Sequence, residues 1–201
     1  HGGTRLEATH LAFAAGRVVA IVGTQRTPPS GPNNGTTVDA YSWRVGSRDW
    51  EPLGPITGGT LSLTTQGDWF AYSTGTQLVF PPSTLFCGEG TVITCSIQGA
   101  RDGSVYDMTT RIRRTLPTPA VPSASADASA FTGAALAAWI DDGTTGRGYA
   151  WDVASGHRVA LPQAPDRVMA AVWTGREIVA IAARPGVATG YVMLRLGPAG
   201  V

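Results

Sequence analysis

A strand-turn-strand unit recurs along this chain of 201 residues, and it constrains the fold more than any other feature. Its clearest copy is the segment 149–162, with the sequence YAWDVASGHRVALP. An alternating strand there enters an Asp-x-x-Ser-Gly turn, and a second strand returns and ends at Pro162. Asp, Ser and Gly favour turns, whereas alternating apolar residues are typical of half-buried strands. The chain is therefore predicted to form a succession of small antiparallel sheets.

The spacing of these units predicts how the sheets are organised. We expect the second strands of successive units near residues 20, 71, 94, 138 and 179. Intervals of roughly 40 to 50 residues are typical of four-stranded propeller blades. The predicted fold is all-β, a β-propeller of about five small antiparallel blades that is either complete or a fragment of a larger propeller. We expect one domain over residues 1–201, with the Pro/Ala/Ser-rich stretch 117–130 as an inter-blade loop.

Composition excludes several classes of protein. Hydrophobic residues make up 43% of the chain and charged residues 14%, which excludes a disordered chain. The net charge of +1 provides no field that would attract nucleic acid or an acidic membrane surface. No apolar run reaches the roughly 18 residues of a transmembrane segment. The sequence contains no lysine, which excludes Schiff-base chemistry.

Short motifs resemble the blades of known propellers. Residues 171–179, AVWTGREIV, look like the first hairpin of a kelch or galactose-oxidase-type blade. Residues 41–43, YSW, followed by 49–53, DWEPL, are similar to the later half of such a blade. Residues 150–156, AWDVASG, resemble a WD-type blade equally well. The resemblance implies a degenerate β-propeller and leaves the function open, because propellers serve as lectins, hydrolases, oxidases and scaffolds.

Two cysteines indicate the compartment of the protein. Cys87 and Cys95 flank the turn-like residues 88–90, so a hairpin turning near residues 90 to 92 would bring their sulfurs opposite one another. We predict a disulfide and an oxidising, extracytoplasmic or secreted location. The alternative is a pair of reduced thiols packed in a buried strand.

The N-terminal residue is the second indication of export. The chain starts at His1 without methionine, which fits either removal of a leader or a piece cut from a longer polypeptide. An N-terminal His1 together with His10 has the nitrogen ligands that copper prefers, yet a cut end explains His1 as well. We predict neither a metal nor another cofactor.

Polar loops provide the candidate binding residues. Loops that join second to third strands lie on one face of a propeller, and their Arg, Asn and Asp side chains are suited to a carboxylate- or hydroxyl-rich ligand. The predicted ligand-binding residues are Arg26, Asn34, Arg101, Asp102, Asp141, Asp142, Arg147 and Arg184. A merely solvated rim is the alternative. Six tryptophans suggest sugar stacking, but we expect Trp139, Trp151 and Trp173 to fill the space between blades.

Catalytic motifs are sparse. The chain has three histidines and no Gly-x-Ser-x-Gly nucleophile elbow. The predicted function is an exported, non-catalytic binding module that recognises glycans or a protein partner. One alternative is a lobe of a carbohydrate-active hydrolase or oxidase that uses Asp102 and Asp141 as acid and base. Another is a structural subunit of a larger extracellular assembly.

Overall fold

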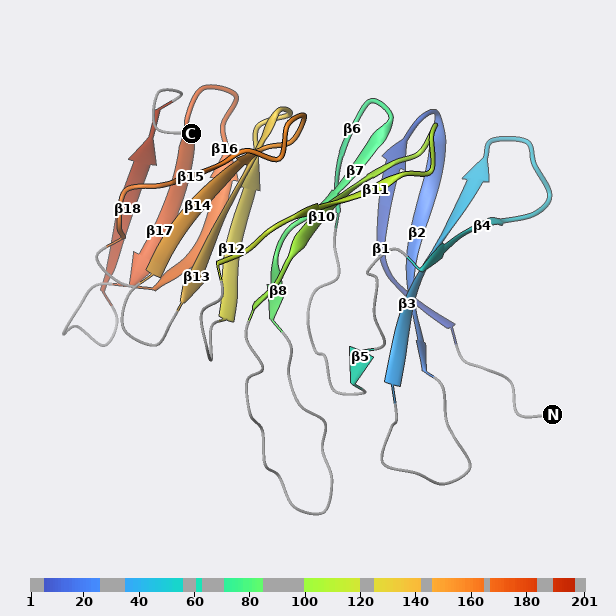
Figure 1. Ribbon diagram of the computed structural model, residues 1–201, viewed down its shortest axis with the longest axis horizontal. Coiled ribbons are helices and arrows are strands. Elements are labelled where there is room, and N and C mark those ends of the chain that lie inside the picture. Colours follow the sequence, from blue (N-terminus) through green and yellow to red (C-terminus); the bar gives the residue numbers. More distant parts are fainter. Residues whose placement is uncertain are drawn as a thin grey trace, which may run out of the picture. The chain divides into compact units, whose positions relative to one another are not determined.

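The fold is described here from a computed structural model, which consists of strands and turns (Figure 1). The described residues are 6–25, 35–55, 61–62, 71–84, 100–119, 125–141, 146–164, 167–183 and 190–197. Within them there is no helix that is long and apolar enough to cross a membrane. The chain divides into two compact units. The first comprises His1–Phe80, Leu85–Ser96 and Ser104–Arg114, and the second comprises Pro81–Thr84, Ile97–Gly103 and Thr115–Val201.

Two antiparallel sheets make up most of the first unit. The first sheet joins four strands in chain order: β1 (Leu6–Ala14), β2 (Arg17–Gln25), β3 (Gly35–Arg44) and β4 (Glu51–Pro55). The short strand β5 (Leu61–Ser62) also pairs with β3. The second sheet has the order β11 (Arg113–Leu116), β10 (Gly103–Asp107), β7 (Gln77–Phe80) and β6 (Tyr72–Thr74).

The second sheet corrects the predicted division into blades. The sequence pattern predicted two separate units with second strands near residues 71 and 94, but β7 and β10, one from each of these regions, are neighbours in one sheet, with Val79 opposite Val105. Beyond them β8 (Ser83–Thr84) pairs with β9 (Ala100–Arg101), so one long hairpin leads from β7 to β10. The strand predicted near residue 94 lies outside the described residues, and a fifth blade is not confirmed. Cys87 and Cys95 themselves lie outside the described residues.

The second unit contains two more sheets of the predicted type. One joins β12 (Ser125–Phe131), β13 (Ala135–Asp141), β14 (Gly146–Asp152) and β15 (Arg158–Ala160) in chain order. The other joins β16 (Val168–Trp173), β17 (Ile178–Ala183) and β18 (Tyr191–Leu196). All of these pairings are antiparallel. The all-β, propeller-type architecture predicted from the repeat is thus present.

Strand β12 is a correction to the sequence analysis. All of its residues except Phe131 fall in the stretch 117–130, which was predicted to be a loop because it is rich in Ala, Ser and Pro. The structure pairs Ala130 with Ala137 and Ser129 with Ala138 in a regular ladder. Small side chains are needed here because Ala130 and Ala137 both lie in the core between two sheets. Composition therefore indicated a linker where tertiary packing requires a strand of small residues.

Each unit has a core between its two sheets, and alanine predominates in the second core but not in the first. In the first unit the core residues are Ala14, Val19, Ile21, Ala40, Ala71, Leu78, Phe80, Tyr106 and Met108. In the second unit they are Ala130, Ala137, Trp139, Ala150, Leu161, Ala164, Val168, Ile178, Ala180 and Ala182. Trp173 packs against the second core, and Trp151 is fully buried. The expectation that a tryptophan fills the space between sheets is confirmed for Trp139, which is a member of the second core.

The Asp-x-x-Ser-Gly turn after β14 has a counterpart after β10, where residues 107–111 read DMTTR and the fifth residue likewise donates its N–H to the carbonyl of the Asp at 2.8 Å. After β14, the Asp152 carboxylate accepts bonds from the backbone N–H and the hydroxyl of Ser155, both at 2.6 Å. After β10, Asp107 accepts bonds from the backbone N–H groups of Thr109 and Thr110 at 2.9 and 2.8 Å. The Thr110 bond is the main reason why the pKa of Asp107 lies below its usual value. The turn predicted at residues 152–156 is confirmed.

The fifth position of this turn distinguishes the two copies. It has a positive φ in both, 77° at Gly156 and 59° at Arg111. Glycine adopts this backbone freely, whereas a residue with a Cβ is strained there. Arg111 is held in this conformation by a contact to the other sheet, because its guanidinium donates to the carboxylate of Glu51.

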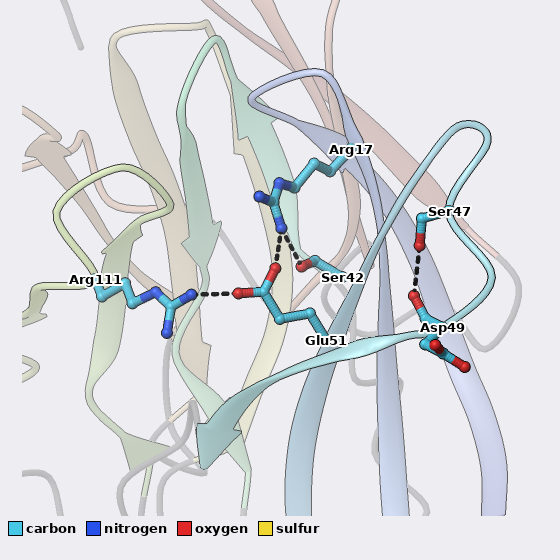
Figure 2. A network of polar contacts seen from close by, with 6 residues as sticks. All are labelled: Arg17, Ser42, Ser47, Asp49, Glu51 and Arg111. Carbon is cyan, nitrogen blue, oxygen red and sulfur yellow. Dashed lines mark hydrogen bonds and ion pairs between the residues drawn. The ribbon is translucent and has the colours of Figure 1, made fainter.

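Glu51 is the centre of a polar brace between the two sheets of the first unit. Figure 2 shows its carboxylate between the guanidinium groups of Arg17 and Arg111. Arg17 also donates to the hydroxyl of buried Ser42 at 3.1 Å. Nearby, the N–H of Ala15 donates to the carbonyl of Gly75 at 2.7 Å, which joins the β1–β2 turn to the β6–β7 turn. Hydrogen bonds from Arg17 and then Arg111 lower the pKa of Glu51.

We expect the Glu51 brace to make stability depend on pH on the acidic side. Because the folded-state pKa of Glu51 is lowered, its contribution is fully present above the ordinary glutamate pKa and is lost as the pH falls through the folded-state value. Glu51→Gln should therefore lower the free energy of unfolding at neutral pH. The difference in this free energy between the variant and the wild type should become smaller as the pH falls. Urea unfolding at several pH values measures this difference.

Arg111→Gly is the matched variant for this test. Glycine suits the left-handed backbone at this turn, so the substitution removes one guanidinium partner without disturbing the turn. We expect Arg111→Gly to reduce the pH-dependent part of the free energy of unfolding. The part that comes from the Arg17–Glu51 pair should remain at least partly. If the free energy of unfolding of Glu51→Gln differs from that of the wild type by the same amount at every pH, the carboxylate charge does not brace the sheets.

Gly148 lies at the tightest point of the second core. It is opposite Trp139 in the β13–β14 ladder. A Cβ at this position would lie 2.8 Å from Trp139 Nε1 and 2.9 Å from Leu161 Cβ. We expect Gly148→Ala to destabilise the protein by about 1–3 kcal/mol, as overpacked core substitutions do. Gly197→Ala is the control, since a Cβ there meets nothing within 4 Å and the substitution should be neutral or slightly stabilising. Equal unfolding free energies for the two variants would contradict this account of the packing.

Candidate functional site

Four of the eight predicted binding residues, Arg101, Asp102, Asp141 and Arg147, fall within the described part of the chain. Arg26, Asn34, Asp142 and Arg184 lie outside the described residues. Arg101 and Asp141 are placed through their backbones, Arg101 opposite Ser83 in the β8–β9 pair and Asp141 opposite Gly146 in the β13–β14 ladder. The segment 141–146 therefore begins and ends at paired residues of two adjacent antiparallel strands.

Asp102 has a local structural partner. It lies between β9 and β10, where its side chain is exposed. Its Oδ1 accepts a hydrogen bond from the backbone N–H of Thr118 at 2.6 Å. Both residues belong to the second unit. This carboxylate therefore braces the segment that follows β11, a role that the sequence did not predict.

Arg147 is the predicted binding residue that lines a cavity. The cavity has a volume of about 210 Å³ and is bounded by Arg147, Gly148, Tyr149, Ala160, Leu161 and Gln163, a set that we call the blade-3 pocket. All six residues come from β14, from β15 or from the segment just after β15. The pocket lies at the end of this sheet where the β13–β14 loop emerges, since Gly148 and Arg147 come just after the first residue of β14.

Tyr149 is held in place by the outer strand and by the segment after β11. The Arg158 guanidinium carbon lies 5.3 Å from the centre of the Tyr149 ring, a cation–π distance. The Tyr149 and Trp151 rings are 6.2 Å apart at an angle of 47°. Arg158 and Trp151 both donate to the carbonyl of Pro117, each at 3.1 Å. These contacts fix the aromatic wall of the pocket before any ligand binds.

Leu161 lines the pocket and also belongs to the second core. Gly148 leaves room for the Trp139 ring, and its carbonyl accepts a hydrogen bond from the N–H of Leu161 at 2.8 Å. Trp139 is 1% exposed. The blade-3 pocket thus combines a rigid floor with exposed Arg147 and Gln163 side chains. Such a set offers a positive charge, an amide that donates and accepts, and an aromatic ring.

Metal chemistry finds no support among the described residues, in which no three His, Cys, Asp or Glu side chains come together. His10, proposed as a second copper ligand, is half-buried in β1, and its Nε2 lies 3.2 Å from the carbonyl oxygen of Ala71. His1 lies outside the described residues. His157 is an exposed turn residue, as the sequence predicts.

Tyr149 and Gln163 were not among the residues predicted from the sequence. Their positions follow from the hairpin register, which pairs Tyr149 with Ala160 and so brings Gly148 close to Leu161 and Arg147 close to Pro162. Counting back from the Asp-x-x-Ser-Gly turn yields this register, because the turn fixes which residues face each other. The search for loop residues overlooked them because they lie in or next to strands.

Comparisons with known proteins support the fold alone. No family model and no curated protein sequence matches the chain. Among solved structures it is similar to TolB from Acinetobacter baumannii, with 12% identity over 98% of this chain and 42% of that one and a TM-score of 0.52. It is also similar to YjhT, with 10% identity over 85% of this chain and 56% of that one and a TM-score of 0.51. The chain thus spans about half of the length of these two structures. Both are β-propellers, and this chain has a β-propeller fold.

Proposed function

We propose that this protein is an exported, non-catalytic binding module, a single propeller-like domain that recognises a glycan at the loop end of its blades. The observation that carries the proposal is the blade-3 pocket. Arg147, Tyr149 and Gln163 surround a cavity of about 210 Å³ there. Glycans are recognised by aromatic faces together with charged and amide groups that bind their hydroxyls and carboxylates.

The size of the pocket favours a glycan over a protein partner. A volume near 210 Å³ suits one sugar ring and falls below the range of drug-sized pockets. A stable protein interface requires a patch of roughly 800 Å² on each partner, which this pocket does not supply. Arg147 further favours a sugar that carries a carboxylate, because guanidinium groups bind carboxylates through two parallel hydrogen bonds. The other predicted loop residues would extend the site along the glycan.

The enzyme alternative depends on different residues. It requires Asp102 and Asp141 as a general acid and base. Asp102 already accepts the backbone N–H of Thr118 at 2.6 Å. The side chain of Asp141 lies outside what the structure describes. Binding at Arg147, Tyr149 and Gln163 requires neither carboxylate, and for this reason we prefer it.

A glycan array tests the proposal directly. We expect the protein to bind acidic glycans on the array and to leave them chemically unchanged. Arg147→Ala and Gln163→Ala should each weaken the binding of the best free sugar by about tenfold or more in calorimetry, since each removes a polar contact. Arg176→Ala is the matched control, because Arg176 is an exposed arginine of the same unit in the β16–β17 turn.

Two results would contradict the proposed site. If no glycan binds, the recognition function is wrong. If a glycan binds equally well to the Arg147 and Gln163 variants, the binding site lies elsewhere. Release of a cleaved or oxidised sugar would support the enzyme alternative, and the Asp102→Asn variant would then show whether that carboxylate takes part.

Export predicts the state of the cysteines. The segment that contains Cys87 and Cys95 begins and ends at a short ladder in which Thr84 faces Ala100. This pairing holds the two ends of the segment together and favours a bridge between its two cysteines. We infer that Cys87 and Cys95 form a disulfide in the native, extracytoplasmic protein.

Thiol labelling measures this disulfide. The denatured native chain should take up no alkylating reagent before reduction and two equivalents after it, as measured by intact mass. The Cys87→Ser variant should take up one equivalent without reduction, because its remaining thiol has no intramolecular partner. Uptake of two equivalents by the unreduced wild-type chain would contradict the disulfide.

A further inference from the structure

One peptide group in the second unit, the group that joins Pro117 to Thr118, is held from both sides, and we call it the clamped peptide. Its N–H, which belongs to Thr118, donates to Asp102 Oδ1 at 2.6 Å. Its carbonyl oxygen, which belongs to Pro117, accepts hydrogen bonds from Trp151 Nε1 and from the Arg158 guanidinium, each at 3.1 Å. A trans peptide group is planar, and its N–H and C=O point in opposite directions. Asp102 therefore lies on one side of the clamped peptide, and Trp151 and Arg158 lie on the other.

The charges on the two sides match the dipole of the clamped peptide. The Asp102 carboxylate lies at the N–H, where the peptide dipole is positive, and the Arg158 guanidinium lies at the carbonyl, where it is negative. Hydrogen bonds to ionised groups are stronger than those between neutral groups, and bonds that form a chain polarise one another. The carboxylate therefore strengthens the hydrogen bonds that the carbonyl accepts.

The backbone around the clamped peptide is stiff. Pro117 and Pro119 flank Thr118, and each proline ring fixes its own φ and restricts the residue before it. Leu116 is fully buried and so anchors the start of the segment. A displacement of the Thr118 N–H therefore moves the Pro117 carbonyl as well, because both lie in one plane.

The two side chains that bind the carbonyl also support Tyr149. The Arg158 guanidinium carbon lies 5.3 Å from the centre of the Tyr149 ring, and the centre of the Trp151 ring lies 6.2 Å from it. Tyr149 is one of the six residues that bound the blade-3 pocket, and neither Arg158 nor Trp151 belongs to that set. Trp151 and Arg158 therefore support the aromatic wall from outside the pocket, and Asp102 supports them in turn.

We propose that Asp102 is a positioning residue for glycan binding in the blade-3 pocket. It holds Trp151 and Arg158 in place through the clamped peptide. These two residues then hold the Tyr149 ring in the orientation in which it meets the sugar. A wall that is ordered beforehand lowers the entropy that binding costs. This role rests on the proposed function, because it concerns the same pocket, and it differs from the acid or base role of Asp102 in the enzyme alternative.

The Trp151 indole N–H reports on the clamped peptide without any ligand. In a nitrogen–proton correlation spectrum, its signal is identified by its loss in Trp151→Phe. Asp102→Ala should speed the exchange of this proton with solvent by about fivefold, because its carbonyl acceptor is held less firmly. Asp102→Asn should exchange at close to the wild-type rate, since its amide oxygen accepts the same N–H. An unchanged rate in Asp102→Ala would show that the carboxylate does not hold the clamped peptide.

Calorimetry with the acidic glycan that binds best on the array measures the effect on recognition. Asp102→Ala should weaken binding by about threefold to tenfold, with a less favourable entropy, because the Tyr149 ring must then be ordered on binding. Asp102→Asn should keep most of the affinity, because it keeps the hydrogen bond to the clamped peptide. Asp49→Ala is the matched control. Asp49 is an exposed aspartate between β3 and β4 in the first unit, and its loss changes the net charge by the same amount.

A double-mutant cycle tests whether Asp102 acts through Arg158. Arg158→Ala removes the guanidinium from the carbonyl of the clamped peptide and from the Tyr149 ring. The double variant should lose less affinity than the sum of the two single losses, because both substitutions break one chain of contacts. Circular dichroism melting checks that each variant is folded, which is expected because Asp102 and Arg158 are exposed.

The outcomes separate the positioning role from the proposed function. If Asp102→Ala binds as the wild type does while Arg147→Ala weakens binding, Asp102 does not position the pocket, and the proposed function stands. If Asp102→Asn binds as weakly as Asp102→Ala, the negative charge itself is required, and the positioning role is wrong. Additive losses in the cycle would show that Asp102 and Arg158 act independently and would also overturn the proposal. If no acidic glycan binds the wild-type chain, the proposed function and the positioning role fail together.

Discussion

The close packing of one sheet face on another is the interaction on which the rest of this structure depends. Small side chains lie in both cores, with Ala14 and Ala40 beside larger residues in the first unit, and with alanines such as Ala137 and Ala180 in the majority in the second. Small residues allow two backbones to approach closely, and the occasional large ring then fills the remaining space. Trp139 is the extreme case, because its ring occupies the space where a side chain at position 148 would lie. The same close packing gives the blade-3 pocket its rigid floor.

The two ends of each sheet have different physical roles. At one end, tight turns satisfy their own hydrogen bonds and also join neighbouring sheets. Asp107 binds its own turn, while Arg111 reaches across to Glu51. The strain of a left-handed arginine is thus compensated by an ion pair, where the equivalent turn simply uses Gly156. The opposite end carries the connections between second and third strands and, next to them, the blade-3 pocket. The Glu51 brace thus involves turns of the first unit, and the pocket proposed for ligand binding lies at the β13–β14 loop end of a sheet in the second unit.

The sequence predicted most of the strands and turns, and its errors have a common cause. Alternation and turn chemistry are local signals, and they correctly placed β2, β14, β17 and the Asp152 turn. The stretch that contains β12 was predicted to be a loop because its composition is typical of linkers. In the structure, the same small residues form a strand that packs closely in the second core. The extra blade was predicted because β7 and β10 lie far apart in the sequence, although they pair directly. For the candidate site, charge and loop position pointed to Arg147, whereas Tyr149 and Gln163 became apparent only with the register.

The sequence by itself determined that the chain is a repeated array of antiparallel strands, because side-chain alternation and turn residues act within a few positions of one another. It also determined the turn at Asp152, whose hydrogen bonds lie within five residues. Only the tertiary structure decided which hairpins share a sheet, which faces of a strand meet another sheet and which stay open. It likewise decided that Glu51 joins Arg17 to Arg111 and that Trp139 requires a glycine at position 148. These features depend on contacts between residues distant in sequence, and no local pattern carries that information.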